Sequence, residues 1–97
     1  MKILVVCNAG MSSSILVKKI MEYAASISEE AIVEAHSSAS VSEQVGKWDV
    51  CLVAPQIMYA VDDIKGKLNI PTAAVDMRAY AIADGKAAYE QAKAMKG

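Results

Sequence analysis

The sequence predicts an α/β fold: a three-layer sandwich in which helices cover both faces of a four-stranded parallel sheet. Short apolar runs suited to buried strands alternate along the chain with segments of helical periodicity. The 97 residues are enough for one hydrophobic core, so we expect a single domain over residues 1–97. Right-handed crossovers between parallel strands allow a doubly wound strand order of 2-1-3-4, which is the order we expect.

The expected strands are four apolar runs. Residues 2–6 and 50–54 are almost wholly apolar, which is typical of strands buried on both faces of a sheet. Residues 31–36 and 72–75 are the other two runs. Pro55 ends the third run, because proline has no N–H to donate to a neighbouring strand.

The expected helices cover residues 12–27, 40–46, 58–68 and 84–95. Asp84 is a suitable N-cap for the last of them, and Gly46 ends the second. In the first helix, apolar residues recur at three- and four-residue steps and form one stripe, namely Leu16, Ile20, Tyr23 and Ile27.

The composition excludes several classes of protein. The chain is 55% hydrophobic and 22% charged, as in a globular protein, and its net charge of −1 argues against nucleic-acid binding. No run approaches the roughly 20 apolar residues of a membrane span, so we expect a soluble cytoplasmic protein without membrane insertion. Two cysteines, Cys7 and Cys51, form neither a disulfide scaffold nor a Cys-x-x-Cys motif, and one histidine, His36, adds too little for a zinc site.

The predicted topology fixes where a site lies. In the order 2-1-3-4 the chain changes direction between strands 1 and 3, and the crevice forms outside the carboxyl ends of those two strands. The loop after the first strand begins at Cys7, and residues 55–57 follow the third. We expect these loops to lie side by side, with residues 76–80 as the far wall.

The loop Cys7-Asn8-Ala9-Gly10-Met11-Ser12-Ser13-Ser14 has the composition of a phosphate site. Small residues that lead into a helix present backbone N–H groups, and the helix N-terminus favours negative charge. Gly10 allows tight turning, and the serine hydroxyls add donors. The same field favours the thiolate of Cys7, which is the reactive form. Cys7 is therefore a candidate nucleophile toward phosphorus, the alternative being an inert buried cysteine at a strand end.

One feature of the loop separates phosphoryl transfer from hydrolysis. A cysteine-dependent phosphatase places an arginine six residues after its cysteine to clamp the phosphoryl oxygens. Ser13 occupies that position here, and the only arginine is Arg78. Without the clamp, hydrolysis lacks its main source of transition-state charge stabilisation, so the loop favours holding and passing on a phosphoryl group.

The loop over residues 7–14 resembles that of enzyme IIB of the bacterial sugar phosphotransferase system, of the lactose/cellobiose/chitobiose type. The resemblance extends to Ala-Pro-Gln-Ile at 54–57, where such proteins typically carry Gly-Pro-Gln-Ile, to Glu34-Ala35 and to Asp84-Gly85. It spans nearly the whole chain. Ala54 in place of glycine and Asn8 in place of a frequent serine are small departures that leave the nucleophile intact.

The resemblance implies a phosphocarrier. Cys7 would accept a phosphoryl group from a phosphohistidine on a IIA protein and pass it to a sugar bound by the membrane subunit IIC. The backbone amides of residues 8–14 would hold the phosphate, Gln56 and Tyr59 would line the facing wall, and no metal or other cofactor would be needed. The sugar would be a β-linked disaccharide such as cellobiose or chitobiose, or lactose, and the carrier would work as a monomer.

Two other functions stay open from the residues alone. One is a small cysteine phosphatase, since the low-molecular-weight phosphatases share this strand–loop–helix arrangement. The other is a non-catalytic, flavodoxin-like interaction domain. Among the remaining polar residues, His36 is expected at a surface or edge position, whereas Asp76 and Arg78 form either a solvated loop ion pair or part of a docking surface.

Overall fold

The structure is a computed structural model and describes residues 1–8 and 14–96. Within these residues one parallel sheet has the order β2-β1-β3-β4, which confirms the predicted topology. Its strands are β1 (Lys2–Cys7), β2 (Ile32–Ser37), β3 (Val50–Val53) and β4 (Thr72–Ala74).

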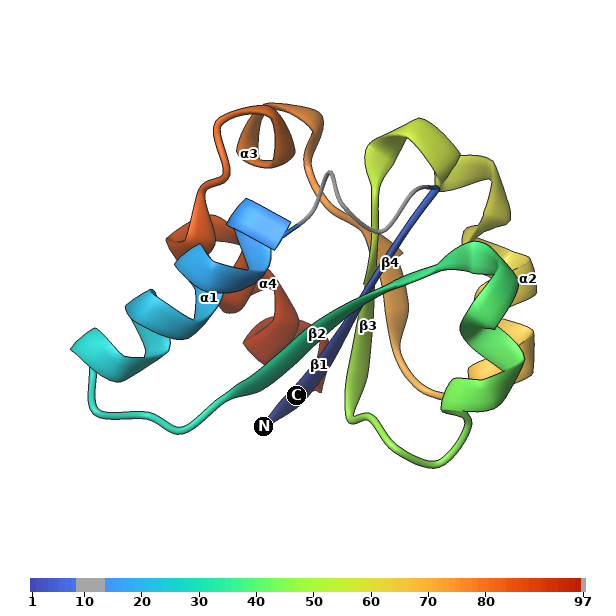
Figure 1. The fold of residues 1–97 in the computed structure, drawn as a ribbon, viewed down its shortest axis with the longest axis horizontal. Helices are drawn as coiled ribbons and strands as arrows, with labels where there is room; N and C mark the ends of the chain where they lie inside the picture. Colours follow the sequence, from blue (N-terminus) through green and yellow to red (C-terminus); the bar gives the residue numbers. More distant parts are fainter. Residues whose placement is uncertain (9–13, 97) are drawn as a thin grey trace.

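Helices cover both faces of this sheet, as predicted. Figure 1 shows α1 and α4 on one side and α2 on the other. Among the described residues the α-helices are α1 (Ser14–Ser26), α2 (Val61–Leu68), α3 (Met77–Ala81) and α4 (Gly85–Lys96), and the 3-10 helices are η1 (Ser38–Gln44) and η2 (Pro55–Ala60).

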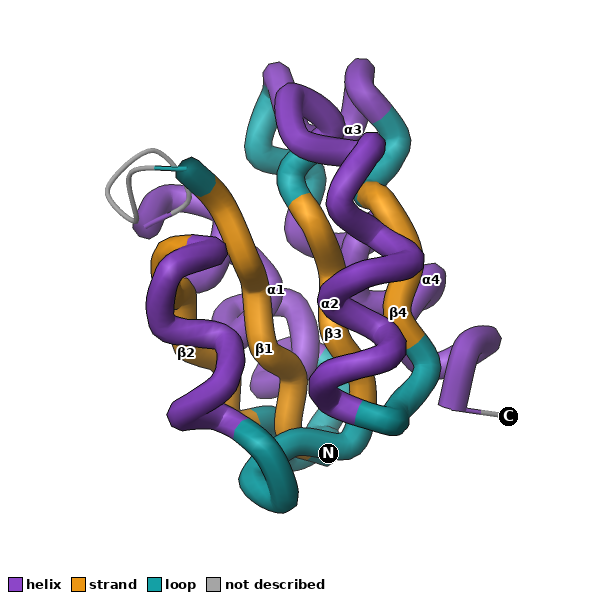
Figure 2. Tube along the Cα trace, turned by 90° about the vertical axis from the view of Figure 1, so that its right-hand side faces the viewer, coloured by secondary structure: helices purple, strands orange, loops and turns teal. Residues whose placement is uncertain are grey.

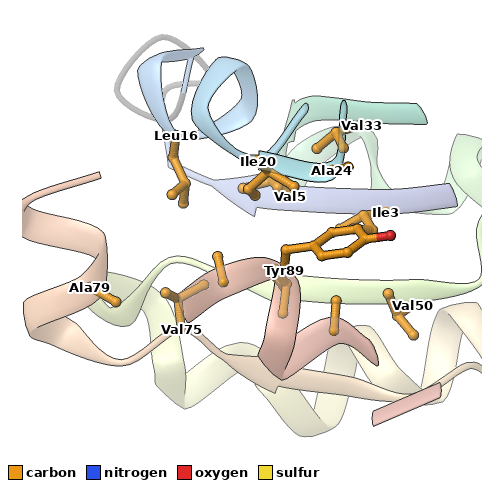
Figure 3. Close-up of a cluster of buried hydrophobic side chains, with 13 residues drawn as sticks. Ile3, Val5, Leu16, Ile20, Ala24, Val33, Val50, Val75, Ala79 and Tyr89 are labelled. Atoms are coloured by element: carbon orange, nitrogen blue, oxygen red, sulfur yellow. The ribbon is translucent and has the colours of Figure 1, made fainter. Parts of the chain in front are cut away.

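Strand β1 lies inside the sheet and supplies both halves of the core. Its side chains alternate, so Ile3 and Val5 pack in the cluster beside α1 and α4, whereas Leu4 and Val6 pack in the cluster beside α2. All four side chains are fully buried. Figure 3 shows the first cluster, with Tyr89 of α4 lying near Ile3. Burial on both faces explains why this strand is apolar throughout rather than alternating.

The stripe predicted for the first helix is correct over most of its length. Leu16 and Ile20 are buried in α1, and Tyr23 packs partly buried against the same cluster. Ile27 lies just beyond the helix and is 39% exposed, so it does not belong to the stripe. Ala24, one residue after Tyr23, is buried in its place.

Two of the predicted helices differ from the structure. The segment expected as one helix over 58–68 is η2 followed by α2, because Pro55 starts a helical turn three residues earlier and Ile57 has non-helical backbone angles. The segment expected over 40–46 is η1, which ends before Val45; that side chain is 53% exposed rather than buried. Both differences concern short 3-10 turns, which have no 3.6-residue repeat to reveal them.

Candidate functional site

The strand ends meet at one edge of the sheet. Cys7 ends β1 and pairs with Ser37 at the end of β2. On the other side the Ala54 N–H donates to the carbonyl of Val6 (2.8 Å), and the Val75 N–H donates to the last carbonyl of β3 (2.9 Å). These bonds bring the residues that follow β1, β3 and β4 to the same edge, which is the arrangement that the predicted topology requires.

Cys7 is the nucleophile candidate at the centre of this edge. Its side chain is only 1% exposed and belongs to the α2-side cluster, together with Ala54 and Ile57 at the start of η2. The thiol is therefore covered at this edge of the sheet. It lies on the side of β1 that faces the turn after β3.

The predicted phosphate loop falls largely outside the described residues. Asn8 is exposed directly after β1, and Ala9, Gly10, Met11, Ser12 and Ser13 are not described. Ser14 is the first described residue of α1 and is exposed. The first turn of α1 carries no acidic side chain, so no carboxylate there opposes an anion. The role of residues 8–14 as a phosphate cradle stays a prediction.

The two residues predicted for the facing wall lie on η2, directly after β3. Gln56 and Tyr59 are both exposed, Tyr59 to 80%. Neither side chain makes a hydrogen bond within the described part of the chain, so both are available to a group that approaches this edge from outside. Pro55 holds the start of η2 in place, since it is buried at the first helical position.

The far wall differs from the expectation of a loop. Residues 77–81 form the short helix α3, and the Asp76 carboxylate caps it by accepting the N–H groups of Arg78 (3.1 Å) and Ala79 (3.2 Å). The sequence left two alternatives for Asp76 and Arg78, a loop ion pair or part of a docking surface. Among the described residues the Arg78 side chain forms no ion pair, so the first alternative is not seen. Five helical residues are too few for a periodic signal, and the Asp76 cap is the only sequence feature that indicates α3.

Large apolar side chains are exposed on the segments around this edge. They come from the start of α1, from η2 and from α3 with the residue after it. Figure 1 shows η2 and α3 beyond the end of the sheet where β1 ends, and Figure 2 shows α3 at that end of the sheet. We call them the edge patch: Ile15 (62% exposed), Met58 (60%), Tyr59 (80%), Met77 (69%) and Ile82 (65%). Exposed apolar side chains that gather around one edge are a feature of protein–protein contact sites.

The other two residues considered from the sequence, Cys51 and His36, lie in surroundings that indicate a structural role. Cys51 is fully buried in β3, and burial raises the pKa of its thiol to about 12, so the thiol stays protonated and unreactive. His36 lies on the edge strand β2, as expected, with its Nε2 2.9 Å from the Glu34 carboxylate. No three His, Cys, Asp or Glu residues of the described chain are grouped to hold a metal ion.

Across residues 1–8 and 14–96, no helix has both the length and the apolar character to cross a bilayer.

Comparison with known proteins gives consistent results. The model of the family described as PTS system, lactose/cellobiose-specific IIB subunit, matches residues 2–91. The oligo-beta-mannoside-specific EIIB component of the PTS system of Bacillus subtilis (strain 168) is 44% identical over 94 residues, which cover 94% of this chain and 91% of that protein.

Two solved structures have the same fold. The cellobiose-specific phosphotransferase IIB component of Borrelia burgdorferi matches with a TM-score of 0.80 and 34% identity, over 98% of this chain and 90% of that one. The lactose-specific IIB component domain of Streptococcus pneumoniae matches with a TM-score of 0.77 and 21% identity, over 96% of this chain and 91% of that one.

Proposed function

The chain belongs to the family of lactose/cellobiose-specific IIB subunits of the sugar phosphotransferase system, and on this premise we propose that Cys7 is the residue that carries the phosphoryl group. IIB subunits are phosphocarriers that work between IIA and IIC components. The observation that supports Cys7 is its position: it ends a central strand at the carboxyl edge of the sheet, whereas the other cysteine, Cys51, lies within β3 and is protonated.

The proposed reaction has two balanced steps. The Cys7 sulfur attacks the phosphorus of a phosphohistidine on IIA; an S–P bond forms, the N–P bond breaks, and the thiol proton ends on the released imidazole. A sugar hydroxyl oxygen then attacks the same phosphorus; an O–P bond forms, the S–P bond breaks, and the hydroxyl proton ends on sulfur. Cys7 is regenerated in each cycle, so one protein molecule transfers many phosphoryl groups.

The residues around Cys7 contribute positioning and charge rather than acid–base chemistry. Phosphoryl transfer is catalysed mainly by alignment of the reacting atoms and by stabilisation of charge on the phosphoryl oxygens. The N–H groups of residues 8–14 and the start of α1 would provide that stabilisation. Gln56 and Tyr59, exposed on η2, would contact the partner or the phosphoryl group from the facing side. Ser13, in place of a clamping arginine, supports transfer over hydrolysis.

We assign the edge patch to partner docking. A donor histidine on IIA and a sugar in IIC both have to reach Cys7, so each partner has to cover the same edge in turn. Flexible methionines and a tyrosine are suited to this, because they adapt to two different partner surfaces. Alternate binding on one face also favours a monomeric carrier in the cytoplasm.

The sugar follows from relatives rather than from residues of this chain. One relative is described as oligo-beta-mannoside-specific and another as cellobiose-specific, so we propose a β-linked di- or oligosaccharide, of the cellobiose, chitobiose or lactose kind.

Intact-mass measurement tests the proposal. The protein is incubated with phosphoenolpyruvate, the general phosphotransfer proteins and a matching IIA. We expect wild type and Cys51→Ser to gain one phosphoryl group and Cys7→Ser to gain none. A gain that persists in Cys7→Ser would show that the carrier residue is wrong. Membranes containing IIC and a panel of β-linked sugars then identify the sugar that removes the group.

A further inference from the structure

We propose that a cavity beside the edge strand β2, lined by residues other than Cys7, binds a phosphorylated sugar, the product class of the transport reaction. The cavity has a volume of about 450 Å³, within the range of small-molecule sites. Its lining includes Lys2 at the start of β1, Glu34 and His36 of β2, and Gln44, Lys47 and Trp48 from the end of η1 and the connection to β3. Lys2 and Cys7 lie at opposite ends of β1.

The observation that points to a ligand is the amide of Gln44. This side chain is buried, with only 7% exposure. Its Oε1 accepts a hydrogen bond from the indole N–H of Trp48 (2.9 Å). This bond orients the amide, so that Nε2 is the end left to bind another group. The Nε2 group, with two donors, has no hydrogen-bond partner in the described part of the chain. A buried donor without a partner costs free energy, so a ligand oxygen in the cavity would be stabilised by it.

The charges of the cavity favour an anion at one end. Lys2 and Lys47 have exposed side chains, and neither forms an ion pair with a described residue. Among the described residues, Glu34 is the only one that lines the cavity with a carboxylate, and one of its oxygens is already 2.9 Å from His36. Two lysines and an amide donor are suited to a phosphate group.

The rest of the cavity suits a hydroxylated ring. Trp48 is half-buried and lines the cavity, and its ring lies 6.4 Å from that of His36 in a tilted arrangement. An indole is a broad apolar surface for the C–H face of a ring. The second oxygen of Glu34 and the His36 ring are the polar groups within reach of hydroxyls. This combination of aromatic surface, carboxylate and cationic donors is the reason for choosing a sugar phosphate over a simple anion.

Only the choice of ligand rests on the proposed function, since a sugar phosphate is what the transport reaction releases. The cavity, its unpartnered amide and its lysines are independent of Cys7. Binding at this site would therefore persist in Cys7→Ser, in which phosphoryl transfer is lost.

Trp48 makes the test direct, because it is the only tryptophan in the chain and it lines this cavity. Wild type and Cys7→Ser are titrated with cellobiose 6-phosphate, cellobiose and inorganic phosphate, with calorimetry as a second readout. We expect a saturable change with cellobiose 6-phosphate in both proteins, and at least tenfold weaker binding of the free sugar and of phosphate.

Variants locate the binding. Gln44→Glu keeps the acceptor for Trp48 but removes both donors and adds negative charge, so we expect at least tenfold weaker binding. Lys47→Gln, a surface change that leaves the core intact, should weaken binding several-fold, whereas Lys86→Gln on α4 should leave it unchanged. No saturable change in wild type, or equal affinity in Lys47→Gln and Lys86→Gln, would overturn the proposal. Cys7 phosphorylation that continues in such a case would leave the proposed function standing.

Discussion

Cys7 and Cys51 lie on adjacent strands of the sheet, but at different positions along them. Cys51 is enclosed on both sides of β3, and desolvation of its thiolate is what raises its pKa to about 12. Cys7 is buried too, but it ends its strand where the chain leaves the sheet. Position along the strand, more than burial, therefore distinguishes the proposed carrier from the structural thiol.

The raised pKa of Cys51 predicts resistance to alkylation. A thiol with a pKa of about 12 is ionised to roughly one part in ten thousand at pH 8, because each pH unit below the pKa lowers the thiolate fraction about tenfold. Iodoacetamide at pH 8 should leave Cys51 unmodified in the folded protein and modify it in guanidinium chloride, as read by peptide mass mapping. Equal rates in the two states would contradict the burial of this thiol.

The contact between α1 and α4 depends on Gly85, the first residue of α4. A Cβ at this position would meet the Lys19 carbonyl group and approach the Ile20 backbone nitrogen to 2.8 Å, closer than real Cβ atoms come. The neighbouring atoms belong to the backbone of α1 and cannot rotate away. Gly85 therefore allows the two helices to pack closely against the same face of the sheet.

Alanine substitutions at two helical glycines should have opposite effects. Gly85→Ala should destabilise the protein by about 3 kcal/mol, because one helix has to move away from the other. Gly66→Ala, in α2, places its Cβ in open space and should stabilise by about 0.5–1 kcal/mol through higher helix propensity. Urea unfolding measures both values. A neutral Gly85→Ala would contradict the close packing of α1 against α4.

Helix α4 is also tied to the connection before β2 by a polar cluster. The Tyr89 hydroxyl donates to Glu29 Oε1 (2.6 Å), and Lys93 Nζ lies 2.9 Å from Glu29 Oε2. The hydrogen bond from Tyr89 and then that from Lys93 lower the pKa of Glu29. Burial of Tyr89, and next its bond to Glu29, raise the pKa of the phenol to about 12.

These shifts predict how stability changes with pH. The lowered pKa of Glu29 stabilises the folded protein at pH values above 4.5, its usual pKa, and this stabilisation is lost as the pH falls through the lowered pKa. The raised pKa of Tyr89 stabilises the folded protein at pH values below 10.0, its usual pKa, and this stabilisation is lost as the pH rises toward 12. Tyr89→Phe should lower the free energy of unfolding by about 1–2 kcal/mol near pH 7. It should also make that free energy less dependent on pH at both the acidic and the alkaline end. Urea unfolding from pH 3 to 11 measures this, and an unchanged profile would contradict the role of this bond.

How far the elements could be predicted depended on their length and burial. The runs that became β1 and β3 were recognisable because both faces are buried, and the start of α4 because Asp84 caps it by accepting the Ala87 N–H (3.0 Å). Short turns were not recognisable: η2 and α3 span six and five residues, too few to show a period. These two turns nevertheless carry most of the edge patch.

At the scale of the whole molecule, sequence order alone placed Cys7 and the turn after β3 at one edge. Parallel strands with right-handed crossovers leave few alternatives, so topology could be derived before any contact was known. The cavity beside β2 could not be derived from the sequence in this way. It is formed by side chains from β1, β2 and the loop before β3, and it includes the Gln44–Trp48 hydrogen bond. Such a site exists only once the chain has folded.

The two sites would then have different roles. The carboxyl edge, with Cys7 and the edge patch, would exchange a phosphoryl group between partners. The cavity that includes Lys2 would bind the released product class. Because Cys7 and the edge patch share no residue with the lining of this cavity, variants at one site should leave the other working.

The lifetime of the phosphorylated protein tests the central claim most directly. Protein phosphorylated through IIA is separated from the donor, and intact mass is followed with time in buffer alone and with membranes that contain IIC and its sugar. A carrier keeps the phosphoryl group in buffer and loses it promptly when the loaded membranes are added, and Cys7→Ser never acquires it. Loss at the same rate with and without the acceptor would mean hydrolysis, and would contradict a carrier role for Cys7.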